Sequence, residues 1–339
     1  CTAAGDGGFM YVNDADVPVY GGSTYLSNNV LVLEKPSTVI SGCTAGEDGG
    51  AIYINDVDGR IYGNGVHDEN TIPENPSTAA IISGCSAEYG GGVYMTGGLL
   101  THSTIVGNKQ TKGGSQNDVC ASGLRIEGGR AEYLTIMDNV SSMRAGGVHM
   151  NGASAVVANC LIAGNKVGSD AVYGTGAYIG NGTIANCTFA NNVGNYCGGV
   201  YADGGTVVNC LFGGNSAEGA TDETPYDVWR GTASKFDRCI ARVQINGNCI
   251  GVADWPTADA CLTPMTMSAA HDASKAVSGL TLPTTDLFGN PRQIGAGIDI
   301  GAIGTEVADA VMNGKELSAA TETLIDLYFA IIFPDGRGI

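Results

Sequence analysis

The chain has 339 residues, a formal net charge of −18 and 43% apolar residues, with aromatic residues at 7% and 53 glycines. This length and apolar content suit one elongated domain or two compact ones, with a core of small and β-branched side chains. The charge excludes nucleic acid and acidic lipid surfaces as partners, because both would be repelled. No signal peptide and no run of 18 or more apolar residues is present, so we expect a soluble segment that does not insert into a membrane.

An internal repeat begins at the first residue. The segments CTAAGDGGFMYV, CTAGEDGGAIYI and CSAEYGGGVYM start at Cys1, Cys43 and Cys85, and successive starts are 42 residues apart. Each unit consists of a cysteine, a polar turn, a glycine pair and an alternating apolar run. Because Cys1 matches the other two cysteines, we expect the chain to begin inside a longer array.

Beyond residue 100 the units shorten and a second signature appears, an apolar residue followed three positions later by asparagine. It recurs at intervals of 31, 26, 27 and 23 residues, at Ile105/Asn108, Ile136/Asn139, Ile162/Asn165, Phe189/Asn192 and Phe212/Asn215. Glycine units such as GGVHM at Gly146 and GGVYA at Gly198 lie between these signatures. Each unit therefore holds three short alternating strands, closed by glycine or asparagine turns.

Such units are too short for a strand, helix and strand, and no 3.6-residue period fits them. They predict an all-β fold, a right-handed parallel β-helix (a solenoid), in which each strand pairs with its counterpart about 4.8 Å away on the next coil. Inward positions would then form ladders. One inner row is expected at Val93/Met95, Val148/Met150, Ala177/Ile179 and Val200/Ala202.

Three recurring residue types are expected to be structural. We expect the asparagines to occupy turns in the left-handed conformation and to hydrogen-bond the next coil, and the paired glycines to form tight corners. The cysteines recur beside small or apolar residues, so we interpret them as small buried hydrophobic residues, with some disulfides as the alternative and zinc disfavoured by the lack of a CxxC pair. This interpretation covers Cys43, Cys85, Cys160, Cys187, Cys210 and Cys239.

The array is expected to end at residue 304. The segment LPTTDLFGNPRQIGAGIDIGAIG runs from Leu282 to Gly304, and residues 305–339 differ in character. The end of a solenoid exposes unpaired strand edges, so we expect residues 305–339 to form an atypical cap, a tail or the start of a further segment. The apolar run LYFAIIF, from Leu327 to Phe333, fits either a strand or a short helix.

Two resemblances arise from these motifs. GGAI at Gly49 to Ile52 with its variants, FANN at Phe189 and FGGN at Phe212 resemble the GGAI and FxxN repeats of chlamydial polymorphic outer membrane proteins, which are β-helical surface adhesins. DLFGNPR followed by IDIGAIG resembles the close of bacterial choice-of-anchor Q domain proteins, although their usual form is nearer to IDIGAYE. The resemblances cover roughly residues 1 to 304 and imply a bacterial cell-surface or extracellular location, but not an activity.

The residues between the inward positions point outward and form a candidate binding surface. Its members are mostly aromatic, which suits stacking on sugar rings or on a protein partner: Tyr11, Tyr53, Tyr94, His149, Tyr178 and Tyr201. The alternative is that these rings stabilise the sheet by packing on one another between coils.

Recurring carboxylates supply the candidates for catalysis and for metal binding. Asp14 and Asp16 recur as Asp56 and Asp58, and equivalents on neighbouring coils would stand about 4.8 Å apart, near the separation that a retaining glycosidase requires. Asp56 and Asp58 are also candidate ligands for Ca²⁺, although no EF-hand pattern is present. The alternative for all four is a solvated turn, and no other cofactor is implied.

A polysaccharide lyase would need cations and a base. The candidates for it are Lys109 with Lys112, or Arg125 with Arg144 and His149.

Taken together, the sequence predicts an extracellular structural or adhesive β-helix stalk of a bacterial cell-surface protein, more consistent with binding than with catalysis. Its partners would be a surface glycan or protein. One alternative is a carbohydrate-active enzyme, a glycoside hydrolase or polysaccharide lyase, on the same scaffold. Another is a self-assembling extracellular fibre, whose copies join end to end.

Overall fold

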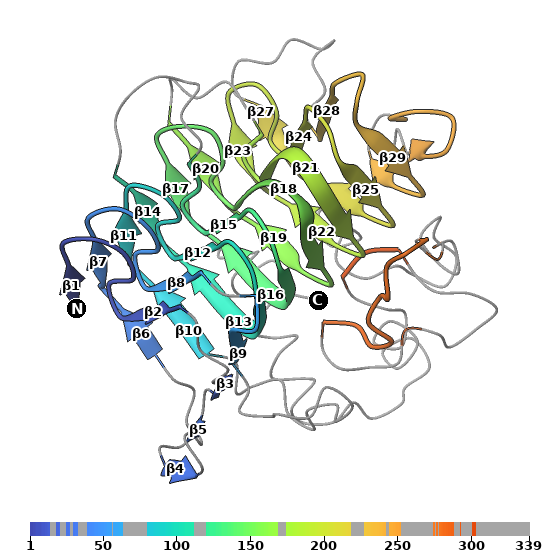
Figure 1. Ribbon diagram of the computed structural model, residues 1–339. Coiled ribbons are helices and arrows are strands. Elements are labelled where there is room, and N and C mark those ends of the chain that lie inside the picture. Colours follow the sequence, from blue (N-terminus) through green and yellow to red (C-terminus); the bar gives the residue numbers. More distant parts are fainter. Residues whose placement is uncertain are drawn as a thin grey trace, which may run out of the picture.

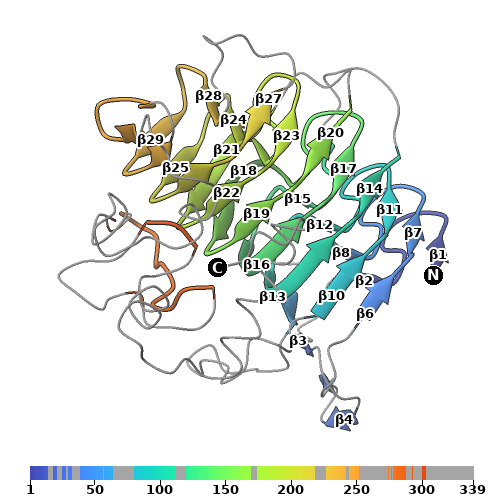
Figure 2. The same ribbon diagram turned by 180° about the vertical axis from the view of Figure 1, so that it is seen from behind.

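The computed structural model describes residues 1–13, 18–20, 25–27, 30–32, 39–55, 57–63, 80–111, 120–168, 174–217, 227–241, 244–251, 274, 276, 278–287, 292 and 300–302. Every regular element in these ranges is a β-strand, and the coils stack along one axis from β1 to β29, with β4 and β5 lying apart from the stack (Figures 1 and 2). All pairings described are parallel except that of β4 (Tyr25–Ser27) with β5 (Val30–Val32). The predicted all-β parallel solenoid is confirmed.

Each coil contributes to four stacks of strands, which we number in chain order. Stack 1 is a separate eight-stranded sheet of two-residue strands: β1 (Thr2–Ala3), β7 (Thr44–Ala45), β11 (Ser86–Ala87), β14 (Lys109–Gln110), β17 (Val140–Ser141), β20 (Lys166–Val167), β23 (Val193–Gly194) and β27 (Ser216–Ala217). Stack 2 follows the glycine units: β2 (Met10–Val12), β8 (Ile52–Ile54), β12 (Val93–Met95), β15 (Leu124–Ile126), β24 (Val200–Ala202), β28 (Val228–Arg230) and the first parts of β18 (Val148–Ala158) and β21 (Ala177–Ala185).

The other two stacks complete the coil. Stack 3 contains the second parts of β18 and β21 together with β3 (Pro18–Tyr20), β9 (Arg60–Tyr62), β25 (Thr206–Val208), β29 (Lys235–Asp237) and the first parts of β13 (Leu99–Val106) and β16 (Arg130–Met137). Stack 4 contains the second parts of β13 and β16 together with β6 (Val39–Ser41), β10 (Ala80–Ser83), β19 (Leu161–Ala163), β22 (Thr188–Ala190), β26 (Leu211–Gly213), β30 (Ile240–Ala241) and β31 (Ile250–Gly251).

The inward residues of these stacks form one continuous core. The predicted inner row is fully buried, from Val93 and Met95 to Val200 and Ala202, and it belongs to the main apolar cluster. Identical residues stack directly between coils, as in Phe189 over Phe212 with ring centroids 5.0 Å apart. Most side chains of this core are small or β-branched. They suit the narrow space inside each coil, between the stacks on its opposite sides.

The recurring asparagines lie at the corner between stack 4 and stack 1 and bond to one another. The amide Nδ2 of Asn165 donates to Asn192 Oδ1 at 3.0 Å and to the carbonyl of Ile136 at 3.0 Å, and Asn139 Nδ2 donates to Asn165 Oδ1 at 3.0 Å. The same pattern links Asn108, Asn139, Asn165, Asn192 and Asn215. The predicted bonding to the next coil is therefore confirmed, and we call this column the asparagine ladder.

The expectation of a left-handed backbone at these asparagines is wrong. The left-handed residue is the one just before each of them, such as Gly107, Asp138 and Asn191, with φ of 63°, 51° and 53°. Two successive residues therefore form this corner. The first turns the chain with its left-handed backbone, and the second, the asparagine, hydrogen-bonds the polar groups that the corner buries. A different corner, between stacks 3 and 4, does have asparagines with positive φ: Asn159, Asn186 and Asn209.

The glycine units are explained by the asparagine ladder. A Cβ on Gly92, Gly123 or Gly176 would lie 3.0 Å from the amide Nδ2 of the ladder asparagine on its own coil. In the coil of β8 the equivalent glycine is replaced by Ala51, and there the ladder position is occupied by Cys85, whose side chain is smaller. The glycine units and the asparagine signature therefore supply the two residues of one packing contact.

The six cysteines interpreted as small hydrophobic residues are buried and unpaired in the described structure, as predicted. They do not share one column, however. Cys43 and Cys85 occupy the asparagine-ladder position, since the Cys43 N–H meets Cys85 Sγ and the Cys85 N–H donates to Asn108 Oδ1. The other four lie at the start of stack 4.

Arg292, the last residue of the FGNPR motif, is buried against the stacks. Arg292 is 1% exposed and donates to Asn159 Oδ1 at 2.6 Å and to the carbonyls of Thr285, Gly301 and Ala302 at 3.1, 2.9 and 3.2 Å. Ala302 N–H also donates to Thr188 Oγ1 at 2.9 Å. Arg292 thus joins Thr285, Gly301 and Ala302 to Asn159 at the corner between stacks 3 and 4.

The expected cap at residues 305–339, including the run from Leu327 to Phe333, lies outside the described residues. The division of the chain at residue 304 stays a prediction. Among the described residues there is no helix with the length and apolarity that a membrane crossing requires.

Replacing Asn165 by alanine is expected to lower the free energy of unfolding by about 2–4 kcal/mol, because it removes the acceptor of the Asn139 backbone N–H and side-chain amide and the side-chain donor to the Ile136 carbonyl and to Asn192 Oδ1. Denaturant unfolding of Asn165→Ala measures this loss. Asn151→Ala, at an exposed position of the same coil, is the control and is expected to change stability by less than about 0.5 kcal/mol.

Replacing Arg292 by alanine is expected to cost about 3 kcal/mol or more, because four buried acceptors each lose a hydrogen bond from the guanidinium. It should also make residues 278–302 the first site of cleavage in limited proteolysis. Arg130→Ala, which removes a partly exposed bond to the Thr281 carbonyl, is the control and should cost below about 1 kcal/mol. Equal losses in the two variants would contradict the proposed anchoring role of Arg292.

Candidate functional site

The outward residues of stack 2 form one column in register. Tyr11 pairs with Tyr53, Tyr53 with Tyr94, Tyr94 with Arg125, Arg125 with His149, His149 with Tyr178, Tyr178 with Tyr201 and Tyr201 with Trp229. We call this column the aromatic ladder. It contains all six residues of the predicted binding surface and adds Arg125 and Trp229.

Neighbouring rings of the ladder are in direct contact. The centroids of Tyr53 and Tyr94 are 5.0 Å apart, those of His149 and Tyr178 are 4.9 Å apart, and those of Tyr201 and Trp229 are 4.0 Å apart, all with nearly parallel planes. Tyr11 meets Tyr53 edge-on at 5.1 Å. Such contacts stabilise adjacent coils beyond simple burial of area.

Burial differs sharply along the ladder. Tyr11 is 48% exposed, whereas Tyr53, Tyr94, Tyr178 and Tyr201 are at most 9% exposed, and His149 is fully buried. The ring faces of the inner members are therefore taken up by their neighbours. A ligand would meet Tyr11, which is the most exposed ring of the ladder, the half-buried Trp229 at the other end, and the polar groups along the edge of the ladder.

Two tyrosine hydroxyls of the ladder are held by carboxylates. Tyr94 OH donates to Glu127 Oε2 at 2.8 Å, while Arg125 lies 4.5 Å above the Tyr94 ring and also donates to Glu127. Burial, with Glu127 as a further cause, raises the pKa of Tyr94 above its ordinary value. Glu127 is thus a charged acceptor shared by a phenol and a guanidinium.

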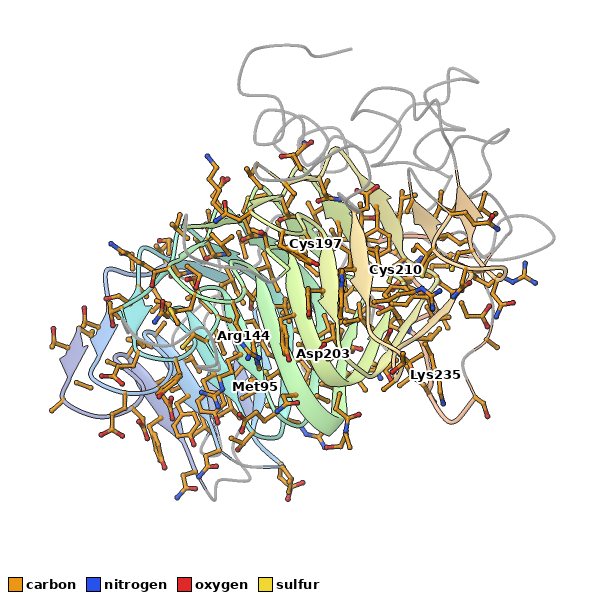
Figure 3. All side chains as sticks on the ribbon, turned by 90° about the horizontal axis from the view of Figure 1, so that it is seen from above. Met95, Arg144, Cys197, Asp203, Cys210 and Lys235 are labelled. Carbon is orange, nitrogen blue, oxygen red and sulfur yellow. The ribbon has the colours of Figure 1, made fainter. Side chains whose placement is uncertain are left out.

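A similar arrangement recurs three coils away. Tyr178 OH donates to Asp203 Oδ2 at 2.7 Å, and the guanidinium of Arg144 lies 4.6 Å from the Tyr178 ring centroid. Figure 3 shows Arg144 and Asp203 close together on this side of the molecule. Burial and the hydrogen bond to Asp203 raise the pKa of Tyr178 to about 12. Both hydroxyls therefore stay protonated as donors at neutral pH.

His149 lies between these two arrangements and has no hydrogen-bond partner. Both ring nitrogens are buried and unbonded among the described groups. Burial lowers the pKa of His149 to about 3, and the nearby Arg125 and Arg144 contribute to that shift. The imidazole is consequently neutral at physiological pH, and it leaves two polar atoms unsatisfied where most coils place an aromatic ring.

A strip of polar side chains runs beside the aromatic ladder, two positions further along each coil. Asn55 Nδ2 donates to Asn13 Oδ1 at 3.2 Å, and Thr96 Oγ1 donates to Asn55 Oδ1 at 2.8 Å. We call this set the polar strip; its members are exposed or half-buried: Asn13, Asn55, Thr96, Glu127, Asn151 and Asp203. It offers amide, hydroxyl and carboxylate groups at the coil spacing.

An aspartate pair lies near the start of the ladder. Asp48 stands one coil from Asp6, and the Asp48 N–H donates to Asp6 Oδ1 at 3.2 Å. Asp48 Oδ1 is buried and has no hydrogen-bond partner among the described groups. Burial raises the pKa of Asp48 to about 6; Arg125 opposes this shift and Asp6 adds to it. Equivalent backbone positions on adjacent coils stand about 4.8 Å apart.

The carboxylates singled out from the sequence fall elsewhere. Asp14, Asp16 and Asp56 lie outside the described residues, and Asp58 is exposed. Their proposed catalytic and Ca²⁺-binding roles stay predictions. Within the described ranges, no group of three or more His, Cys, Asp or Glu residues is arranged to hold a metal ion. Of the cations considered for a lyase, Arg125, Arg144 and His149 do come together, whereas Lys109 lies exposed in stack 1 and Lys112 lies outside the described residues.

Several residues of this face were missed in the sequence. Glu127 and Asp203 each follow a ladder residue by two positions, so the repeat alignment itself places them on the same outward face. Asp6 and Asp48 recur in GDGG and EDGG. Trp229 lies beyond the irregular stretch after Ala217, where the repeat is hard to align.

Comparison of the chain with protein-family models, with curated proteins and with solved structures found no match.

Replacing His149 by phenylalanine is expected to stabilise the protein by about 1–2 kcal/mol, because it keeps the ring on Tyr178 and removes two unsatisfied buried nitrogens. Thermal or denaturant unfolding measures the change. His102→Phe is the control, because His102 is half-buried and is also stacked, on Tyr133, but bonds Thr101 Oγ1 at 2.7 Å. That variant should gain nothing, and a destabilised His149→Phe would show that the imidazole has a partner in solution.

Acid should destabilise the wild type more than His149→Phe. The folded-state pKa of His149, about 3, lies below the ordinary value of 6.5, so the unfolded chain binds the additional proton. Stability from this group is therefore present above pH 6.5 and is lost as pH falls towards 3, by up to about 1.4 kcal/mol per pH unit. Unfolding measured at pH 7, 5 and 4 tests this, and identical pH slopes in the two proteins would contradict it.

Proposed function

We propose that the chain is an extracellular structural and adhesive β-helix of a bacterial cell-surface protein, and that it binds a surface glycan or protein along the polar strip without catalysis. The observation that supports this most is the packing of the aromatic ladder. Its rings are used to join the coils, and the exposed groups beside them repeat along the axis of the solenoid. This arrangement suits a rigid rod with an extended contact surface.

The polar strip is the contact surface on chemical grounds. Amide, hydroxyl and carboxylate groups bond the hydroxyl groups of neutral sugars, and Tyr11 offers an exposed ring for stacking. Glu127 and Asp203 are already acceptors for tyrosine hydroxyls, so they are fixed in position. With a formal charge of −18, the chain would repel polyanionic glycans, so a neutral glycan is favoured over an acidic one.

Binding to an array of neutral glycans and to intact cells tests this proposal. We expect binding without release of any product, and a loss of at least about tenfold in affinity, near 1.4 kcal/mol, in the double variant Asn55→Ala/Asn151→Ala. Thr44→Ala, exposed on stack 1, is the matched control and should bind normally. Unchanged binding by the double variant, with its fold intact, would overturn the polar strip as the contact surface.

A glycoside hydrolase is the second candidate, and the aspartate pair favours it. Asp48, with its pKa raised to about 6, has the property of a general acid, and Asp6 on the adjacent coil would be the nucleophile. The backbone spacing of about 4.8 Å between adjacent coils is compatible with the 5–5.5 Å between the two carboxyl groups of retaining enzymes. Turnover of any glycan that Asp48→Asn abolishes without unfolding the protein would favour this candidate over the adhesive one.

A further inference from the structure

The start of stack 4 contains five cysteines on successive coils. Register places Cys160 beside Cys187, Cys187 beside Cys210, Cys210 beside Cys239, and Cys239 beside Cys249. The first four thiols each donate to the carbonyl two residues earlier in the chain, as Cys160 Sγ does to the Ala158 carbonyl at 3.0 Å, and all five cysteines are free. We call this column the cysteine ladder; Figure 3 labels Cys210, its middle member.

The spacing of the ladder suits disulfide bonds. Parallel strands in register place equivalent Cα atoms about 4.8 Å apart, and disulfides join Cα atoms that are 4.4–6.8 Å apart. For the last pair, the Ile250 N–H donates to the Cys239 carbonyl at 2.9 Å, which fixes Cys249 next to Cys239. A bond between them therefore needs only side-chain rotation and small backbone adjustments.

Access distinguishes the last pair from the others. Cys160, Cys187 and Cys210 lie between full coils and are fully buried. Cys249 precedes the two-residue strand β31, which in the described structure pairs only with β30, and its neighbours Asn248 and Ile250 are exposed. Local opening of this edge costs less than opening a complete coil, so a small reagent reaches Cys249 first.

We propose that Cys239 and Cys249 are a redox-active pair that forms a disulfide on exposure to a small-molecule disulfide, while the inner members of the cysteine ladder stay reduced. The Cys249 thiolate attacks the reagent R–S–S–R, forming a mixed disulfide and releasing one R–SH. Cys239 then attacks the Cys249 sulfur of that mixed disulfide, and the second R–SH leaves. Two protein thiols are oxidised and one reagent disulfide is reduced, so atoms and electrons balance.

The consequence is a reversible lock on the last described coil. A bond between Cys239 and Cys249 ties β31 and the loop before it to β30, at the edge where stack 4 ends in the described structure. The unfolded chain loses conformational freedom when this loop is closed, so the oxidised protein should be the more stable form. This inference does not depend on the proposed adhesive function.

Peptide mapping of the native protein tests the pair. A Cys1→Ser variant is used, because Cys1 is exposed and would link two chains. After incubation with oxidised glutathione and alkylation of the remaining thiols under denaturing conditions, we expect a peptide linked through Cys239 and Cys249, with Cys160, Cys187 and Cys210 alkylated. Cys249→Ser should abolish the link, and the matched variant Cys187→Ser should leave it in place.

The unfolding temperature gives a second readout. Oxidation should raise it, and dithiothreitol should reverse the rise in the parent protein and have no effect in Cys249→Ser. A lasting glutathione adduct on Cys249, a link between Cys210 and Cys239, or no oxidation of either partner would overturn the proposal.

Discussion

The structure depends on one contact, the packing of a ladder asparagine against a glycine of the same coil. The amide of Asn139 or Asn165 bonds a backbone carbonyl of the preceding coil and the next asparagine, and thereby satisfies polar groups that the corner buries. It can lie there only because Gly123 and Gly147 have no side chain. Leaving these polar groups buried without hydrogen bonds would cost free energy of folding. The contact between asparagine and glycine therefore constrains the geometry of the corner, and with it the geometry of the coil.

The column of aromatic residues on the outward face results from the stacking of coils in register. Coils that repeat their backbone also superimpose their side chains, so outward tyrosines become a ladder whether or not a ligand exists. Arg125 and His149 interrupt this column without breaking it, because a guanidinium and an imidazole are also planar. Around these two residues, two tyrosine hydroxyls donate to carboxylates, and a histidine with a lowered pKa lies between them.

The sequence predicted the stacking and the inner rows because a repeat constrains every coil at once. It was less informative at the corners. Asn108 and Asn159 are the same residue type, yet only Asn159 has a left-handed backbone, since that choice depends on which neighbour turns the chain. The cysteines show the same limit, because Cys85 and Cys160 look equivalent in the repeat but lie in different columns, and only pairing between coils separates them.

By itself, the sequence determined the architecture, because alternation, glycine corners and a fixed repeat leave a parallel solenoid as the arrangement that buries the apolar rows. The candidate site was decided by tertiary structure. Contacts between coils decide which outward rings are covered and which carboxylate meets which hydroxyl. They also bury one oxygen of Asp48 and both ring nitrogens of His149 without a partner among the described groups. The contacting residues lie 23 to 42 positions apart in the sequence, on coils of unequal length. Arg292 shows this most clearly, since its partner Asn159 is 133 residues away and no local pattern connects them.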